Sequence, residues 1–306
     1  MPPAAFIRPD QPEPDRGEPT AMSTTSATPT VSVAHSRAVQ PSHRPGFTDL
    51  LRSEWTKFRS LRSTWWSLAL VTVVSLGVSI LATSLITASY NTLDPATKAQ
   101  FHDDTVGLFL EPGQQFGQLF VVVLGVLLIA SEFSTGMIRS TVLAAPRRYS
   151  ALAAKAVVLS AVVFVLSEVI AWISFLAGAA IAHKHQVVTV STPGTLRAIL
   201  GFGVVMVLAG LFALAVGTLV RHTAAAMAVG LAMFLVVPVL LGFIPGSAGE
   251  HITNAMPSQA AQLVMDRTIQ PGVPYTQLEA LGIAVAWTAV LLVPAFVSFK
   301  KRDIRA

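Results

Sequence analysis

The sequence predicts an all-α integral membrane protein with six transmembrane helices, and three observations support this. Hydrophobic residues make up 53% of the 306 residues and charged residues only 12%, with a mean hydropathy of +0.62. Soluble proteins average about a quarter charged residues, so this chain lacks the charge to cover a surface in water. Six segments are long and apolar enough to cross a bilayer, which takes about 20 residues each. Basic residues gather at the ends of these segments on one side.

The six predicted spans follow one another along the chain. They are residues 66–86, 114–133, 153–181, 198–220, 224–244 and 278–299. The second span is weaker at its start, because Gln114, Gln115 and Gln118 fall there. Pro238 and Pro294 are expected to kink the fifth and sixth spans, since proline lacks the N–H that an inner helical turn needs.

Two spans carry small residues at a spacing of four, which places them on one face of a helix. The members are Ala209, Ala213 and Gly217 on the fourth span and Ala224, Ala228 and Ala232 on the fifth. Small residues at this spacing let helix backbones approach closely inside a membrane. We therefore expect both faces to form contacts between helices.

The chain begins with a polar segment, followed by an amphipathic one. Residues 1–46 are rich in Pro, Ser, Thr and Ala and lack apolar periodicity, so we expect a disordered cytoplasmic tail rather than a signal peptide. Met22 is a second candidate for the start codon. Residues 47–65 place aromatic and aliphatic side chains on one helix face and basic ones elsewhere. Such a helix suits the headgroup region of a membrane.

The distribution of basic residues predicts the orientation of the spans. Among the basic residues near the spans, the thirteen on one side are Arg52, Lys57, Arg59, Arg62, Arg139, Arg147, Arg148, Lys155, Arg221, Lys300, Lys301, Arg302 and Arg305, and the four on the other are Lys98, Lys184, Arg197 and Arg267. Because loops rich in Lys and Arg stay in the cytoplasm, both termini are predicted to be cytoplasmic. The transmembrane domain then covers residues 66–299, and residues 300–306 form a basic cytoplasmic tail.

The sequence also excludes several kinds of chemistry. It has no cysteine, hence no disulfide, thiol nucleophile or cysteine-based metal site. A Gly-Lys dipeptide is absent, so no GxxxxGK loop can bind ATP here, and neither HExxH nor GxSxG occurs. The basic residues do not form the face that nucleic acid would need. His183 and His185 lack a neighbouring acid and make poor ligands. We therefore expect no catalysis, metal or cofactor on this chain.

Two acidic residues stand in apolar surroundings. Glu54 projects into the apolar face of the amphipathic helix. It either snorkels or pairs with Lys57, or it meets a cation on the cytoplasmic loop or on a partner protein. Glu168 lies midway along the third span, where an ionisable group is rare. We expect its carboxyl to be protonated and hydrogen-bonded to a neighbouring helix, the alternative being a polar point on a substrate path or subunit interface.

The most specific pattern is a charged stretch between the second and third spans, from Glu132 to Lys155. Apolar spans flank it, so it must lie at a membrane surface, and its basic residues place it on the cytoplasmic side. Its candidate functional residues are Glu132, Gly136, Arg139, Pro146, Arg147, Arg148 and Lys155. Gly136 permits a turn that a bulkier residue would resist, and the arginines could pair with carboxylates of a partner protein.

This pattern resembles the first cytoplasmic loop of ABC-2 type transporter permeases, where a short helix docks on a separate ATPase. Residues 53–57, SEWTK, resemble the interfacial helix before the first span of that family. Residues 257–265 resemble its outer re-entrant helix before the last span. The resemblance extends over residues 47–299 and adds Glu54 and Lys57 to the candidate ATPase-coupling residues.

The resemblance implies the membrane half of a bacterial exporter in the cell (plasma) membrane. Two permease chains, expected to be a homodimer, would form the substrate path in the lipid bilayer, and a separate ATP-binding subunit would bind and hydrolyse ATP. Two alternatives stay open. The first is a permease-like subunit of a sensing or immunity complex that moves no solute. The second is an intramembrane enzyme that uses Glu168, which would need a second polar group at similar depth.

Overall fold

Six helices of the computed structural model are long and apolar enough to cross a membrane, which confirms the predicted all-α fold of a multi-pass membrane protein. The structure describes residues 46–134, 148–267 and 272–301. No strand occurs within these three ranges. The spanning helices are Arg62–Ala88, Thr105–Phe133, Tyr149–Ala182, Thr195–Val220, Thr223–Leu241 and Gln277–Phe299. Each of them overlaps one predicted span over most of its length.

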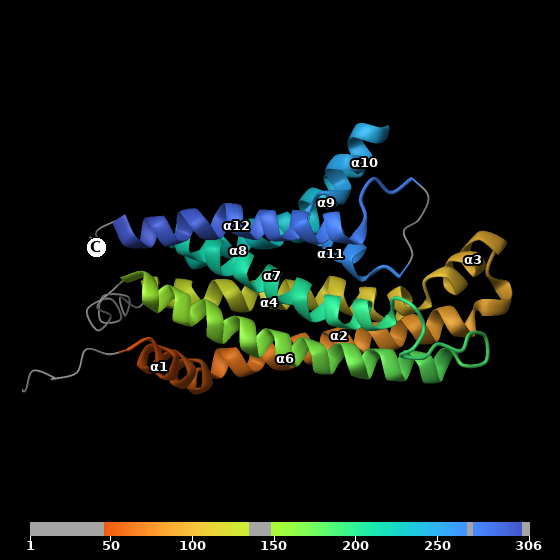
Figure 1. Cartoon of the computed structure of the whole chain (residues 1–306), viewed down its shortest axis with the longest axis horizontal. Coiled ribbons are helices and arrows are strands. Elements are labelled where there is room, and N and C mark those ends of the chain that lie inside the picture. The colour runs from red at the N-terminus through yellow and green to blue at the C-terminus, as the bar shows by residue number, and fades with distance from the viewer. Residues whose placement is uncertain (1–45, 135–147, 268–271, 302–306) are drawn as a thin grey trace, which may run out of the picture. The chain divides into compact units, whose positions relative to one another are not determined.

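The helical elements follow one another with short connections (Figure 1). They are α1 (Phe47–Ser60), α2 (Arg62–Ala88), η1 (Tyr90–Thr92), α3 (Pro95–Asp103), α4 (Thr105–Ser134), α6 (Arg148–Ala182), α7 (Thr195–Val220), α8 (Thr223–Leu231), η2 (Ala232–Val236), α9 (Val237–Leu241), α10 (Ser247–Asn254), α11 (Pro257–Met265) and α12 (Gln277–Lys301). Helix α1, the start of α6 and the end of α12 lie at one end of the bundle, and α3 lies at the other. Helix α11 has the bounds that the sequence predicts for a short helix before the last span.

Helices α4 and α7 form the centre of the bundle. In their most apolar stretches, 61% of the residues of α4 and 72% of those of α7 are buried, against 22–33% in the other four spans. Helices α2 and α6 lie on one side of this pair, and α8 and α12 lie on the other (Figure 1). The outer helices expose apolar side chains such as Val73 and Val239. Such faces suit contact with lipid, where no water has to be excluded.

Small residues bring α4 and α7 together, backbone against backbone. Ala209 and Ala213 of α7 are buried against α4, on the face that the sequence predicts for helix contact. A Cβ atom added to Gly125 of α4 would lie 2.5 Å from the carbonyl oxygen of Gly210 and 2.9 Å from the Cβ of Ala213. No larger residue fits there without moving a helix, so this contact depends on glycine.

The predicted small-residue face of the fifth span is not the face that packs within this chain. Ala224 and Ala228 are exposed, whereas Ala226 and Gly230 are buried. Gly230 faces α4 closely, since an added Cβ would lie 2.8 Å from a side-chain carbon of Val122. Glycine permits the closer approach, and the helix therefore turns this face inward.

The predicted amphipathic helix is interrupted at Leu61. This residue is extended (φ −82°, ψ 117°), so α1 ends at Ser60 and α2 begins at Arg62. The last residues of the predicted segment, as far as Trp65, therefore belong to the first span. The break lets the chain change direction between a short helix and a spanning one.

The second span is longer than predicted because neighbouring groups cover its glutamines. Gln114 and Gln118 are each 1% exposed, and the Gln114 amide donates to the Gln118 carbonyl at 2.7 Å. The side-chain oxygen of Gln115 accepts a hydrogen bond from Gln262 of α11 at 3.0 Å. These polar groups weaken the apolar signal of the sequence, yet their side-chain hydrogen bonds lie inside the protein, where Gln114 Oε1 is the one buried oxygen of the three described glutamines without a partner, and α4 starts at Thr105.

Pro238 distorts the fifth span, as the sequence predicts. The π-helical turn η2 separates α8 from α9, and the N–H of Val237 donates to the carbonyl of Ala232, five residues back. Because Pro238 has no N–H, a regular helix could not continue its hydrogen bonds through this position. Pro294, in contrast, lies inside the continuous helix α12.

The Gly125 contact yields a test of the packing. Gly125→Ala should lower the melting temperature of the purified protein, because overpacking costs about 1–3 kcal/mol. Gly77→Ala in α2 is the matched control, since an added Cβ meets nothing within 4 Å there. The control should leave the melting temperature unchanged or raise it. Equal melting temperatures for the two variants, measured in one detergent, would refute the close contact.

The orientation can be measured with single cysteines, because the native chain has none. Ser60→Cys lies at the α1 end, and Lys184→Cys and Ala99→Cys are exposed positions at the other end. An impermeant thiol reagent added to intact cells should label the last two and spare the first, as the basic residues predict. Labelling of Ser60→Cys from outside would reverse the predicted topology.

Candidate functional site

Four charged side chains from three helices meet at one end of the bundle. They are Glu54 and Lys57 of α1, Glu132 of α4 and Lys155 of α6, and together they are called the charge cluster below. The Lys155 Nζ lies 2.6 Å from Glu54 Oε2 and 2.9 Å from Glu132 Oε1. The Lys57 Nζ lies 2.8 Å from Glu54 Oε1 and 3.4 Å from Glu132 Oε1. Each lysine therefore contacts both carboxylates.

Three of the four side chains of the charge cluster are buried, so their charges must be paired with opposite charges for the fold to be stable. Lys155, Glu54 and Glu132 are exposed by only 3%, 4% and 6%. An ion removed from water costs several kcal/mol unless opposite charges compensate for it. Two cations face two anions here, so the cluster has no net charge. Loss of a single member would leave an unpaired charge in the interior.

The apolar face of α1 positions Glu54. Leu50 lies one turn before it and packs with Ala151 and Ala154 of α6, next to Lys155. Phe58 lies one turn after it and is buried in the main core. Glu54 must therefore point inward between these two anchors. Two of the partners that the sequence analysis considered for Glu54 are present together. Glu54 pairs with Lys57 and also with Lys155, the cation that ends the 132–155 stretch.

Two groups of the cluster have shifted pKa values. Burial opposes ionisation of Glu54, but Lys155 and Lys57 outweigh it and hold its pKa below the ordinary value of 4.5. Burial also lowers the pKa of Lys57, yet the carboxylates of Glu54 and Glu132 outweigh that effect and raise it above 10.5. Both side chains are therefore charged at neutral pH.

One oxygen of the cluster remains without a partner. Glu132 Oε2 is buried and makes no hydrogen bond to any described residue. Glu132 lies at the end of α4, three residues before the stretch 135–147 begins. Arg221, at the end of α7, is also near this end, with its guanidinium 5.3 Å from the ring centre of Phe133.

The other candidate residues of the loop are not part of the described geometry. Gly136, Arg139, Pro146 and Arg147 lie outside the described residues. Arg148 is the first residue of α6, where only the backbone is described. Of the nine candidate coupling residues, the structure thus brings together Glu54, Lys57, Glu132 and Lys155.

Glu168 faces a neighbouring helix, α7, as expected from the sequence. Its carboxyl lies against Gly203, whose backbone is its polar contact there and where an added Cβ would collide with Oε1. Both carboxyl oxygens are buried, and no side chain of a described residue forms a hydrogen bond with either. Phe164, one turn earlier on α6, also lies beside Gly203. The carboxyl fills the space that glycine leaves on α7.

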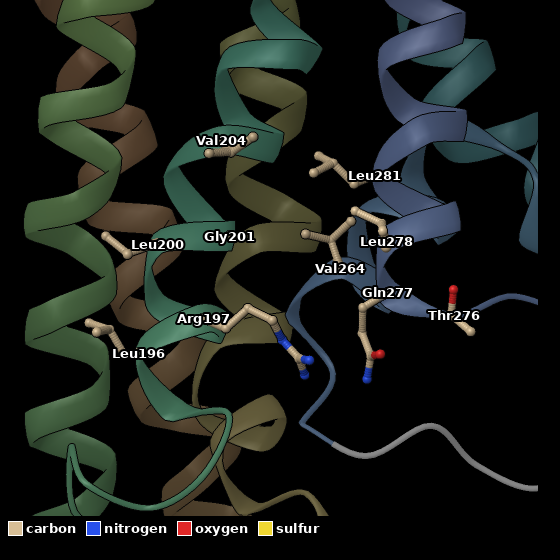
Figure 2. A pocket seen from close by; sticks show the side chains of 10 residues that line it. All are labelled: Leu196, Arg197, Leu200, Gly201, Val204, Val264, Thr276, Gln277, Leu278 and Leu281. Atoms are coloured by element: carbon tan, nitrogen blue, oxygen red, sulfur yellow. The ribbon is translucent and has the colours of Figure 1, made fainter.

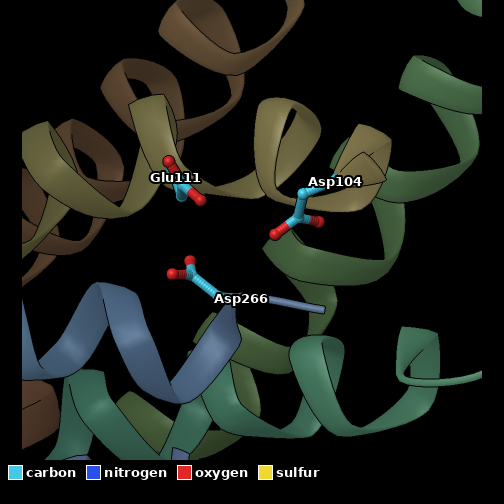
Figure 3. Close-up of side chains that lie close together, drawn as sticks. All are labelled: Asp104, Glu111 and Asp266. Carbon is cyan, nitrogen blue, oxygen red and sulfur yellow. The ribbon is translucent and has the colours of Figure 1, made fainter. Parts of the chain in front are cut away.

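A second cluster, at the opposite end, escaped the sequence analysis (Figure 3). Carboxylate oxygens of Asp104, Glu111 and Asp266 lie within 4.8 Å of one another, close enough to share a cation. Asp104 accepts hydrogen bonds from the backbone N–H groups of Gly107 and Arg267, each at 2.9 Å. Burial raises the pKa of Asp104, and it raises that of Asp266 to about 6. The spacing from 104 to 111 is two helical turns, but nothing in the sequence links either residue to 266.

The two loop histidines, His183 and His185, each contact a group outside this acidic cluster. The ring of His185 stacks on Tyr90, with ring centres 4.1 Å apart. His183 Nδ1 lies 2.8 Å from the carbonyl oxygen of Ala180. The two rings thus serve different neighbours.

The charge cluster should make stability depend on pH in a defined way. A lowered pKa of Glu54 means that its stabilising effect is present above about pH 4.5 and is lost as the pH falls through the folded value. A raised pKa of Lys57 means that its effect is present below about pH 10.5 and is lost as the pH rises through the folded value. The melting temperature should therefore be highest between these limits and fall outside them.

Glu54→Gln tests this assignment directly. The variant should melt lower at pH 7, because Lys155 loses a partner, and its melting temperature should depend less on pH on the acidic side. Glu250→Gln changes an exposed acid of α10 and serves as the control with an unchanged profile. If the melting temperature of Glu54→Gln fell as steeply with decreasing pH as that of the native protein, the role of Glu54 would be contradicted.

Comparison with known proteins gives a family but no activity. A family model described as "Protein of unknown function (DUF2705)" matches residues 102–305. The matched region contains α4 to α12, with Glu132 and Lys155, and begins after α1 and α2. No curated protein matches the chain. Because the match covers more than half of its length, the chain belongs to the DUF2705 family.

Proposed function

We propose that this protein is the permease subunit of a bacterial ABC exporter of the ABC-2 type. Two copies of the chain would form the substrate path across the plasma membrane. A separate subunit would bind and hydrolyse ATP, so this chain would be neither an enzyme nor the holder of a cofactor. The charge cluster would be the element that links ATP hydrolysis on that subunit to transport through this chain.

The observation that supports this proposal is the position of Lys155 between Glu54 and Glu132. One ammonium group joins a short helix outside the spans, α1, to the ends of two spans, α4 and α6. A partner that pushes on α1 or on the stretch 135–147 would displace these spans together. Separation of α1 from α4 and α6 would leave buried charges unpaired. Removal of one partner of a buried ion pair costs about 3–5 kcal/mol.

The packing of α4 and α6 against α7 would transmit a displacement of the charge cluster to the centre of the bundle. Helix α4 contacts α7 without intervening side chains at Gly125, and α6 closes on α7 at Gly203. Tightly packed helices move as units between discrete arrangements and do not deform gradually. A rotation of α4 and α6 would therefore alter the packing around α7 along the whole span.

The intramembrane enzyme is the least supported alternative. No side chain of a described residue forms a hydrogen bond with Glu168, and acid–base catalysis by a carboxyl would need a second polar side chain beside it. The sensing or immunity complex would use the same coupling contacts but would move no solute. ATP hydrolysis stimulated by a solute in a reconstituted complex separates the transporter from that alternative.

The first experiment identifies the partner. The full-length chain, carrying an affinity tag, should co-purify from mild detergent with a protein that contains GxxxxGK[ST]. Reconstitution of the two in lipid vesicles should give ATP hydrolysis that neither shows alone. Purification without any nucleotide-binding partner, under conditions that keep the chain folded, would refute the proposal.

Glu132→Gln then tests the coupling. The substitution keeps the shape of the side chain and removes one charge of the cluster, so the variant should insert and bind the ATPase. Transport per ATP hydrolysed should fall by at least about fivefold, a modest allosteric coupling energy. Glu250→Gln is the matched control in an exposed helix. Native coupling in Glu132→Gln would show that the cluster does not transmit the push.

A further inference from the structure

A long apolar groove runs along one face of α7 and is not occupied by any described part of the chain. One half, of about 610 Å³, lies between α7, α11 and α12 and includes Leu200, Leu278 and Leu281 (Figure 2). The other half, of about 680 Å³, lies between α6, α7 and α12 and includes Phe164 and Leu211. Val204 lines both halves, which follow one another along α7. The whole is called the α7 groove below.

The length of the α7 groove fits an acyl chain. Its lining on α7 extends from Leu196 to Leu211, which corresponds to about 22 Å of helix at about 1.5 Å per residue. One leaflet of the hydrocarbon core is about 15 Å thick. A lipid tail could therefore lie in the groove over its full depth in the membrane. Leu196 and Leu200 are 49% and 44% exposed, so their faces are open to such an occupant.

The polar residues of the groove lie almost entirely at one end. Arg197, Thr276 and Gln277 stand where α7 and α12 begin, and beyond them Ser160 is the one polar residue among the lining side chains. Figure 2 shows the Arg197 side chain extending toward the segment that precedes α12. An amphiphile has the same distribution, with one polar end and a long apolar remainder. A protein helix, in contrast, would not need a single charged end.

The charge at that end selects an anion. Arg197 is the only charged residue among those lining the groove. Its Nη2 donates to the backbone carbonyls of Asp266 and Arg267, at 2.6 and 3.2 Å, which holds the guanidinium in place. Nε and Nη1 have no hydrogen-bond partner among the described residues, and these two donors match two oxygens of a phosphate.

The charged groups around this position are Glu279, Asp104 and Asp266, and the charge of Arg197 acts on the last two carboxylates. Helix α7 begins at Thr195, and its N-cap residue Gly194 offers no side-chain cap, so its N-terminal N–H groups add to the positive potential. Glu279 is the nearest acid on α12, and its carboxylate caps that helix through the N–H and hydroxyl of Thr276. The carboxylate of Asp266 lines a separate polar cavity with Asp104.

We propose that the α7 groove binds an anionic phospholipid, with the phosphate on Arg197 and an acyl chain along α7 toward Leu211. Under the predicted orientation, the lipid belongs to the outer leaflet. This inference does not depend on the transport function, because it rests on the groove and its charged end alone.

The test uses the full-length protein with one cysteine, Leu200→Cys, labelled with bimane. The labelled protein is placed in nanodiscs of phosphatidylcholine that contain a small fraction of brominated phosphatidylglycerol or brominated phosphatidylcholine. Bromine quenches bimane on contact. The anionic lipid should quench with about fivefold higher apparent affinity, as expected for a partly exposed charge pair. Val73→Cys, 68% exposed on α2, is the control and should respond equally to both lipids.

Two further variants, each added to the labelled Leu200→Cys protein, identify the source of the preference. Arg197→Gln should abolish it, and Arg197→Lys should retain most of it. Should Arg197→Gln fail to fold, Val204→Trp keeps the arginine but fills the point where the two halves meet, and it should reduce quenching by both lipids. Equal quenching of Leu200→Cys by the two brominated lipids would overturn the proposal. So would cross-linking of Leu200→Cys between two chains, which would assign the groove to a second copy.

Discussion

The ion pairs of Lys155 with Glu54 and Glu132 are the interaction on which the described arrangement at this end of the bundle depends. The ammonium group stands between a short helix outside the membrane spans and the end of a central span. All three side chains are almost fully buried, so none can leave the cluster without exposing the others to an apolar environment. These ion pairs therefore hold α1, α4 and α6 together at this end of the bundle.

The centre of the bundle extends this arrangement across the membrane. Helices α4 and α7 are the most buried spans, and their contact at Gly125 leaves no space for side chains. The polar residues that a membrane span usually avoids are used at the other end of α4, where Gln115 binds Gln262 of α11. One helix, α4, thus contacts the charge cluster at one end and the short helix α11 near the other.

The sequence predicted the fold because its signals are local. Apolar length marks each span, and the distance from Glu54 to Lys57 marks a pair on one helix face. The resemblance also selected Glu54, Glu132 and Lys155, and a cation of the cytoplasmic stretch was one partner considered for Glu54. The sequence could not identify that cation as Lys155 or pair Lys155 with Glu132, since these contacts join positions 101 and 23 residues apart. The acidic residue Asp266 was missed for the same reason. The α7 groove could not be predicted from the sequence, because exposed Leu200 and buried Ile199 are both apolar and the sequence does not tell them apart.

A double-mutant cycle on Glu54 and Lys155, read out as transport per ATP hydrolysed in vesicles, tests the central claim most directly. Glu54→Lys and Lys155→Glu should each impair coupling, because each places like charges together in the interior. The exchanged pair should recover most of it, with an interaction energy of about 0.5–3 kcal/mol. Additive losses in the double variant would contradict the account, since the two residues would then act independently of one another.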